Sequence, residues 1–260
     1  MRLKTFILAC ALIAALLLFA QRRAAAPKAP EFASVVDLTH SFGDKTPSYE
    51  VESGYKATTV KEIARDGYYL RNICLPEHFG THIDAPAHFA AGRWTVDQIP
   101  PARLIGPLVV IDVSAQARLN ADYQVSLDDV SIWEKANGAI PPGAIVMART
   151  GWSEKWNTPA AYRNPDARGT LHFPGFAEDT ARFLVDARGV VALGIDTLSV
   201  DYGPSRDYPV HHYTSSRSVY HLENVADLDR VPESGAIVLV GPAKLEGGSG
   251  GPVRILALLR

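Results

Sequence analysis

Residues 78–89 read HFGTHIDAPAHF and place three of the chain's eight histidines within eleven residues of one another. Neutral imidazole nitrogens and carboxylate oxygens are good ligands for Zn²⁺ and Mn²⁺, so this density favours a metal site over a metal-free polar cluster. His78 and His82 are four residues apart, as in the helical HExxH motif, but Phe79 stands where that motif needs a glutamate. Gly80 also disfavours a regular helix here.

A turn at Gly80 followed by an extended piece fits the stretch better than a helix does. His82 and Asp84, two residues apart on an extended segment, point to the same side of the chain. A proline then ends the segment and leaves His88 close to them but displaced. We therefore predict a metal held by His78, His82 and Asp84, with His88 as a general acid or base rather than a fourth ligand.

A second cluster of metal-binding residue types lies at 208–224, YPVHHYTSSRSVYHLEN. It supplies His211, His212, His221 and Glu223. Their chemistry alone does not decide between three roles, which are completing the first site, holding a second metal, and lying on a surface loop.

Several short apolar runs rich in β-branched residues recur along the chain. Their nearly continuous apolar character is typical of strands buried on both faces. The predicted strands are Ser34–Leu38, Leu108–Val113, Ala144–Ala148, Val190–Ile195, Ala236–Val240 and Arg254–Leu258. One helix is predicted from Ser126, which forms a capping-box pattern with Asp129, to about residues 137–138. Another is predicted from about Phe176 to Arg188, with Gly189 as its stop.

These elements predict an α/β fold with a dominant sheet and one domain over residues 34–260. A composition of 47% hydrophobic and 21% charged residues is ordinary for a globular protein. The formal net charge is −2, and no long basic run follows residue 30, so nucleic acid is not an expected partner.

The start of the chain has the pattern of an export signal. Arg2 and Lys4 precede an apolar run of 15 residues, 6–20, which is shorter than a transmembrane helix needs. We predict a signal peptide over residues 1–26 and a linker over 27–33. Cleavage would give a periplasmic or secreted protein without stable membrane association, whereas retention, favoured by Arg22 and Arg23, would anchor it to the membrane.

Two alternative nucleophiles are disfavoured. Cys74 would be the only cysteine left after cleavage, which excludes an intrachain disulfide, and its apolar neighbours favour a small core residue over a reactive thiol. Ser249 stands in GGSGG (247–251), which satisfies G-x-S-x-G. The hydrolase elbow needs a helix after the serine, however, and Pro252 with a strand-like run follows instead.

The stretch HFGTHIDAPAHF resembles the signature of the cyclase family, which includes bacterial kynurenine formamidase and isatin hydrolase. Every fixed position of His-x-Gly-Thr-His-x-Asp-x-Pro-x-His is matched. The resemblance extends over residues 34–260, through segments similar to the family's opening strand, central segments and C-terminal strand region. These segments are VVDLTHSF (35–42), RTGW (149–152), GIDTLSVDYGPSRDYPVHH (194–212), LENVADLDRVP (222–232) and KLEGGSGGPVRILAL (244–258).

By this resemblance, His78, His82 and Asp84 match the family's metal ligands and His88 its catalytic histidine. His211 and Glu223 match the pair that holds a second ion in the dinuclear zinc members, with the aspartate bridging. Isatin hydrolases use a single manganese, so one or two ions of Zn²⁺ or Mn²⁺ are implied. The implied fold is kynurenine formamidase-like (swivelling β/β/α), with a mixed sheet and flanking helices, in a homodimer or higher oligomer.

The resulting hypothesis is a metal-dependent hydrolase of a linear or cyclic amide, in which activated water attacks a carbonyl and His88 moves the proton. Phe79 and Trp94 are candidates for an aromatic wall beside a flat small-molecule substrate, although packing roles suit them equally. His212 is a further candidate for substrate contact. The alternative function is an exported metal-binding or small-ligand-binding protein without turnover, which would need the ligands but not His88.

Overall fold

The computed structural model describes residues 32–50 and 54–259. The chain separates into residues 1–33 and residues 34–260. The predicted signal peptide and most of the predicted linker lie outside the described residues. Within the described ranges, no helix is both long enough and apolar enough to cross a membrane.

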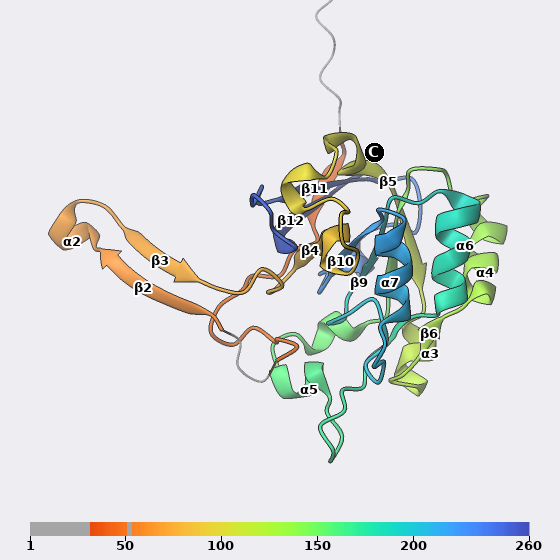
Figure 1. The fold of residues 1–260 in the computed structure, drawn as a ribbon, viewed down its shortest axis with the longest axis horizontal. Helices are drawn as coiled ribbons and strands as arrows, with labels where there is room; N and C mark the ends of the chain where they lie inside the picture. Colours follow the sequence, from red (N-terminus) through yellow and green to blue (C-terminus); the bar gives the residue numbers. More distant parts are fainter. Residues whose placement is uncertain (1–31, 51–53, 260) are drawn as a thin grey trace, which may run out of the picture. The chain divides into compact units, whose positions relative to one another are not determined.

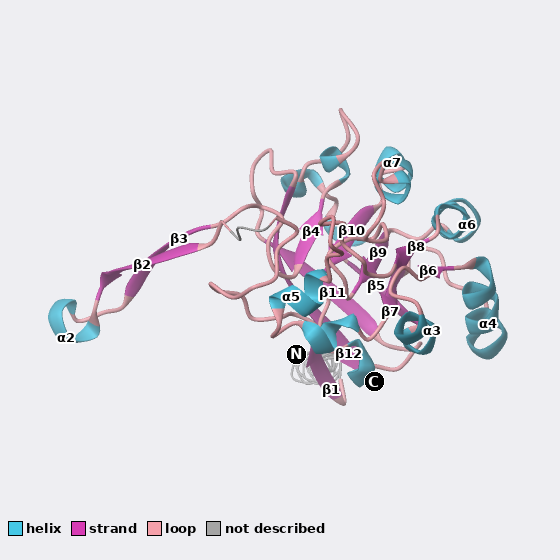
Figure 2. Ribbon diagram, turned by 90° about the horizontal axis from the view of Figure 1, so that it is seen from below, coloured by secondary structure: helices cyan, strands magenta, loops and turns pink. Residues whose placement is uncertain are grey.

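An eight-stranded mixed sheet organises residues 34–260 (Figures 1 and 2). In spatial order its strands are β1 (Ser34–Asp37), β12 (Gly250–Leu259), β11 (Ile237–Pro242), β5 (Ile105–Asp112), β7 (Ile145–Arg149), β9 (Ala192–Ile195), β10 (Tyr220–Glu223) and β4 (His82–Asp84). Strands β5, β7, β9 and β10 run parallel to one another, and the other neighbours are antiparallel. Because β4 also pairs with the first residues of β12, the sheet curls until it closes on itself.

Alternate residues of these strands serve two different cores. Leu108 and Val110 of β5 pack into a cluster built from all eight strands, which fills the inside of the closed sheet. Val109 and Ile111 point the other way, into a cluster shared with the helices. This two-sided burial explains why the strands are continuously apolar in sequence rather than alternating.

Three helices cover the outer face of the parallel strands (Figure 1). They are α4 (Leu127–Asn137), α6 (Glu178–Arg188) and α7 (Pro209–Ser216). The predicted capping box is present, since the Ser126 side chain accepts from the Asp129 amide and the Asp129 carboxylate accepts from the Ser126 amide. Gly189 ends α6 in the left-handed conformation, as predicted.

The remaining elements are short. The helices are α2 (Ile63–Asp66), α3 (Ser114–Leu119) and α5 (Pro159–Arg163), and the 3₁₀ turns are η1 (Pro86–His88), η2 (Val96–Gln98), η3 (Pro101–Arg103), η4 (Trp152–Lys155) and η5 (Leu228–Arg230). Two small sheets pair β6 (Gln124–Val125) with β8 (Gly175–Phe176) and β2 (Lys56–Lys61) with β3 (Leu70–Cys74).

Strands β2 and β3 form a hairpin that extends away from the main sheet (Figure 2). All five residues of β3 are exposed, including Cys74. The expectation that Cys74 is a core residue is therefore wrong, because its apolar neighbours belong to an exposed arm rather than to a buried strand.

All six predicted strands are confirmed, and each belongs to the main sheet. Their ends move by up to four residues. The second predicted helix begins at Glu178, two residues late, because Phe176 pairs with Val125 in the small β6–β8 sheet. The predicted α/β single-domain fold with a mixed sheet and flanking helices is the observed one.

Candidate metal centre

The candidate centre forms where β4 closes the sheet, because two strand partners meet there in register. His82 lies opposite Glu223 of β10, and Asp84 lies opposite His221. The residue between each pair, Ile83 or Leu222, is fully buried on the inner side of the sheet. Strand alternation therefore directs four metal-binding side chains to the outer side together.

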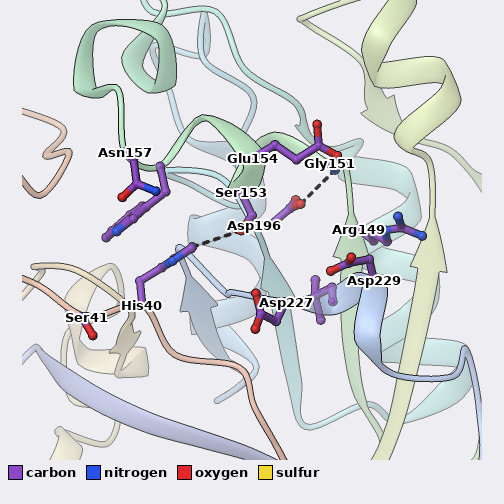
Figure 3. Close-up of a pocket in the computed structure, with 12 residues that line it drawn as sticks. His40, Ser41, Arg149, Gly151, Ser153, Glu154, Asn157, Asp196, Asp227 and Asp229 are labelled. Carbon is purple, nitrogen blue, oxygen red and sulfur yellow. Dashed lines mark hydrogen bonds between the residues drawn. The ribbon is translucent and has the colours of Figure 1, made fainter.

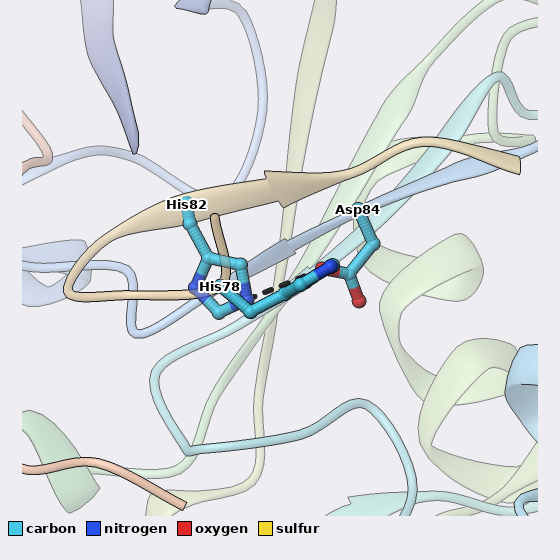
Figure 4. Close-up of side chains that lie close together, drawn as sticks. All are labelled: His78, His82 and Asp84. Atoms are coloured by element: carbon cyan, nitrogen blue, oxygen red, sulfur yellow. Dashed lines mark hydrogen bonds and ion pairs between the residues drawn. The ribbon is translucent and has the colours of Figure 1, made fainter. Parts of the chain in front are cut away.

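On its other edge, β4 pairs with β12, where Gly250 lies opposite Asp84. The missing side chain of Gly250 leaves the space that the His78 ring occupies, since a Cβ there would lie 2.5 Å from His78 Cε1. The chain reaches His78 through a turn at Gly80, whose φ is +67°. Figure 4 shows His82 and Asp84 on β4 and His78 directed toward the Asp84 carboxylate.

The two oxygens of each buried carboxylate face different imidazoles. Asp84 Oδ1 lies 2.6 Å from His78 Nδ1 and 3.1 Å from His82 Nε2. Asp84 Oδ2 lies 3.2 Å from His211 Nε2 and 3.7 Å from His221 Nδ1. Glu223 divides in the same way, with Oε2 3.4 Å from His82 Nε2 and Oε1 3.3 Å from His211 Nε2. Asp84 and Glu223 thus each have one oxygen near His82 and the other oxygen near His211.

In His82 and His211, a hydrogen bond donated by Nδ1 fixes the tautomer and leaves the lone pair of Nε2 free to bind a metal. His82 Nδ1 donates to the Gly80 carbonyl at 2.9 Å, and His211 Nδ1 donates to Asp201 Oδ2 at 2.7 Å. Asp201 also accepts from the amides of Val210 and His211, which fixes the start of α7. A backbone carbonyl or carboxylate behind a metal-bound imidazole is the usual arrangement that sets its tautomer, so these residues fit a metal.

His78 is held from behind by Ser249, whose Oγ lies 3.0 Å from His78 Nε2. Ser249, His78 and Asp84 therefore line up like a Ser–His–Asp triad. The Ser249 hydroxyl, however, donates to Glu77 at 2.7 Å, and Ser249 does not line the cavity described below. The hydroxyl thus positions the imidazole rather than acting as a nucleophile.

The electrostatics of the centre favour a bound cation. Burial would raise the pKa of Asp84, but hydrogen bonds with His211 and the other imidazoles outweigh it and hold that pKa well below its usual value. Burial would likewise lower the pKa of His82, yet the hydrogen bond and charge of Asp84, together with Glu223, raise it to about 9. The buried negative charge of the carboxylates is therefore stabilised by nearby positive charge, which either protonated imidazoles or a metal ion can supply.

A cavity of about 420 Å³ opens onto this centre and is lined by His78, His82, Asp84, His211 and Glu223. His88 lies at its edge, in the turn after β4, with its ring stacked on that of His78 at 4.0 Å between centroids. Partial burial is the largest influence on His88 and lowers its pKa to about 4. His88 is thus a neutral imidazole at pH 7, which suits a proton acceptor.

The three residues predicted to contact substrate lie elsewhere. Phe79 is 1% exposed and packs against Phe42 and Tyr55. Trp94 packs against the inner core with Arg103 over its ring, and His212 is exposed on the side of α7 next to Phe89.

The aromatic residues that do line the cavity are Tyr49, Phe89 and Tyr208, which the sequence analysis did not single out. Tyr208 has a φ of +45°, unusual for a bulky residue, and its hydroxyl lies 3.1 Å from that of Tyr49. Backbone strain of this kind is common at ligand-binding sites, but no sequence pattern around Tyr208 predicts it.

A second cavity, of about 440 Å³, is shown in Figure 3. There His40 is hydrogen-bonded to Ser153 at 3.2 Å and stacks on Trp156, and Asp196 accepts from Thr150 and Gly151. Among the described residues, two sets of three possible metal ligands converge, His78–His82–Asp84 and Asp84–His211–His221. Both sets lie beside the 420 Å³ cavity, which is therefore the candidate site.

Comparisons with known proteins point to one family. The Cyclase family model matches residues 36–202. The chain is 32% identical over 242 residues to isatin hydrolase of Roseibium aggregatum, covering 86% of this chain and 91% of that protein. It is 28% identical over 234 residues to kynurenine formamidase of Salinibacter ruber, covering 87% and 97%. The structure of isatin hydrolase A from Ralstonia solanacearum superposes with a TM-score of 0.82 at 34% identity, covering 91% of this chain and all of that one.

Proposed function

The chain belongs to the cyclase family of metal-dependent amide hydrolases, and we propose that it opens a neutral aromatic cyclic amide with a metal ion held by His78, His82 and Asp84. The observation that supports this proposal is the convergence of imidazole nitrogens on Asp84, each held from behind by a hydrogen-bond acceptor. Histidine and carboxylate donors suit both Zn²⁺ and Mn²⁺, and we propose one of these as the native ion.

We also propose a second ion, for which His211 and Glu223 would supply ligands beside Asp84. The division of the Asp84 and Glu223 oxygens between two groups of imidazoles supports two ions rather than one.

A divalent ion at this centre supplies Lewis-acid activation of water and of the substrate carbonyl. The chain's own residues do the rest. His88 accepts a proton at the edge of the cavity and delivers it to the departing nitrogen, which its neutral ring allows at pH 7. Asp201 and the Gly80 carbonyl keep His211 and His82 in one tautomer throughout.

The lining of the cavity favours a flat, uncharged substrate. Tyr49, Phe89 and Tyr208 offer aromatic faces, and among the described residues that line the cavity there is no lysine or arginine. An amino-acid substrate such as N-formylkynurenine carries a carboxylate, which a basic side chain would normally bind. An isatin-like ring amide has no such group and matches the cavity better.

The test is a comparison of kcat/KM for isatin and N-formylkynurenine, using enzyme loaded with Zn²⁺ or with Mn²⁺. We expect hydrolysis of isatin, loss of activity after chelation, and recovery when the ion is returned. Turnover that survives complete metal removal would refute the metal-dependent mechanism. A higher kcat/KM for N-formylkynurenine would refute the substrate class.

We further propose that two copies of the chain associate through the β2–β3 hairpin. An isolated two-stranded hairpin is marginally stable alone, and this one exposes large apolar side chains, which usually mark an interaction surface. They are Val60, Ile63, Tyr68, Tyr69, Leu70 and Ile73. Light scattering of Tyr69→Lys with Ile73→Lys should show a monomer, and unchanged mass would refute the proposal.

Export directed by residues 1–26 is also proposed, since the charged start and the 15-residue apolar run support it. Fractionation of cells with N-terminal sequencing tests it. We expect a mature protein that begins after residue 20 outside the cytoplasm.

A further inference from the structure

His221 is the one imidazole of the centre that has no role in the function proposed above. Its side chain is 1% exposed, and it is absent from the lining of the cavity, so it does not reach a substrate. Its Nδ1 has no hydrogen-bond partner among the described residues, although it is fully buried. A buried polar nitrogen without a partner is costly and calls for an explanation.

The hydrogen bonds around His221 determine which kind of atom is left without a partner. His221 Nε2 lies 2.5 Å from Thr214 Oγ1. The Thr214 hydroxyl hydrogen is already donated to the Val210 carbonyl at 2.7 Å, one turn earlier in α7. Thr214 Oγ1 therefore accepts from His221 Nε2–H, and the other nitrogen, Nδ1, carries a lone pair.

That lone pair faces negative charge. Nδ1 lies 3.7 Å from Asp84 Oδ2, too far for a hydrogen bond and with no hydrogen to share in the neutral ring. Asp84 Oδ2 is in turn 3.2 Å from His211 Nε2, and His211 Nε2 is 3.3 Å from Glu223 Oε1. These atoms are acceptors when the imidazoles are neutral, and the ligand atoms of His221, His211 and Asp84 lie within 4.8 Å of one another, so that one cation between these three would satisfy them.

The spacing of these donors fits a first-row divalent ion. Ligands about 2.0–2.1 Å from a tetrahedral ion are roughly 3.3 Å apart, and Asp84 Oδ2 lies 3.2 Å from His211 Nε2 and 3.7 Å from His221 Nδ1. We therefore propose, building on the two-ion hydrolase above, that His221 Nδ1 is a ligand of the second ion, together with His211 and Asp84.

This assignment gives the two ions different behaviour. The side chains of His211, His221 and Asp84 are at most 5% exposed, whereas that of His78 is 26% exposed. The ion beside His78 can exchange and meet substrate. The ion held by His221 has a fully buried ligand that does not line the cavity, so it should leave more slowly than the ion beside His78 and should stabilise the closure between β4 and β10.

Metal binding rather than activity tests the assignment. Elemental analysis after dialysis against a competing chelator should find two ions per wild-type chain and one in His221→Leu, with the dissociation constant of the second ion raised at least ~100-fold. The matched control is His40→Leu, which removes a partly buried imidazole also bonded to a hydroxyl, at Ser153, outside the centre. It should keep both ions.

A second, milder variant keeps the assignment testable if His221→Leu does not fold. Thr214→Val keeps the volume of the side chain and the His221 ring but removes the acceptor behind it, and should weaken the second ion about 10- to 100-fold. Anomalous diffraction from wild-type crystals needs no variant and should place an ion within about 2.3 Å of His221 Nδ1.

The outcomes separate this inference from the function on which it rests. Two ions retained equally by wild type and His221→Leu, or an ion more than 3 Å from His221 Nδ1, overturn the ligand assignment alone. A single ion that His82→Ala loses and His221→Leu keeps does the same. Wild-type protein that binds no divalent ion overturns the proposed function as well.

Discussion

Replacing Gly250 by alanine tests the construction of the centre without touching a ligand. The new Cβ would lie 2.5 Å from His78 Cε1, 2.9 Å from His78 Nδ1 and 2.8 Å from the Ile83 carbonyl oxygen. Carbon atoms normally approach to about 3.5 Å, so the ring or the strand must move by about 1 Å. Ile83 lies between His82 and Asp84 in β4, which makes movement of the strand equally damaging.

A displacement of about 1 Å exceeds the ~0.2 Å tolerance of metal–ligand distances, so His78 should be lost as a ligand. We expect the affinity of the exchangeable ion to fall at least ~100-fold, equivalent to about 2.7 kcal/mol, and kcat/KM to fall by about the same factor. Isothermal titration with Zn²⁺ or Mn²⁺ measures the first quantity, and isatin hydrolysis at fixed metal concentration measures the second.

The neighbouring residue supplies the control. An alanine at Gly251 projects to the opposite face, where its nearest contact is Leu245 Cδ1 at 3.3 Å, the end of a side chain that is 38% exposed. Gly251→Ala should therefore bind metal and turn over like wild type. If circular dichroism shows both variants folded and Gly250→Ala binds metal as tightly as Gly251→Ala, the absence of a side chain at residue 250 is not needed to accommodate His78.

Three further predictions follow from single side chains. His88→Ala should lower kcat by ~10²–10⁴-fold with metal content unchanged, and full turnover in that variant would exclude the proton transfer assigned to it. Ser249→Ala should weaken metal binding ~10- to 100-fold yet regain activity at saturating metal, whereas loss of a nucleophile could not be rescued. Burial lowers the pKa of His40 from 6.5 to about 4, so only the unfolded chain takes up this proton as pH falls through 6 and 5. Stability should therefore drop by about 2 kcal/mol from this group between pH 7 and pH 5, and urea unfolding of His40→Phe should show a correspondingly smaller drop.

Local sequence predicts the parts of this protein that depend on local physics. Continuous apolar runs predicted six of the eight strands of the main sheet, since burial on both faces leaves no room for polar alternation. The arrangement of His78, His82 and Asp84 was accessible because a glycine turn and a two-residue spacing act within seven residues. Helix α7 and strand β10 were not predicted, because both lie in the segment 208–224, where polar and metal-binding side chains interrupt the apolar pattern.

Two features of the centre depend on pairing between strands that are distant in sequence. His221 was one of four candidates in the second cluster, and its role stayed open until the register of β4 and β10 set it opposite Asp84. Gly250 looks like part of a flexible loop until β12 sets it opposite the same aspartate. The aromatic lining was misassigned for a different reason, since Phe79 precedes the turn at Gly80 and its ring is buried against Phe42 and Tyr55.

The G-x-S-x-G match at 247–251 shows how one geometry can suggest two chemistries. Ser249, His78 and Asp84 line up as a triad would, but a triad serine must give its proton to the histidine, and Ser249 gives it to Glu77. Glu77 also accepts from the amides of Ser249 and Gly250, which fastens the start of β12 beside β4. The hydrogen bond from Ser249 to Glu77 prevents the serine from acting as a nucleophile. The hydrogen bond between Ser249 and His78 Nε2 also keeps His78 Nδ1 directed toward Asp84. The glycines on either side let the backbone come close enough for this, so the motif belongs to the metal centre through its backbone rather than through its hydroxyl.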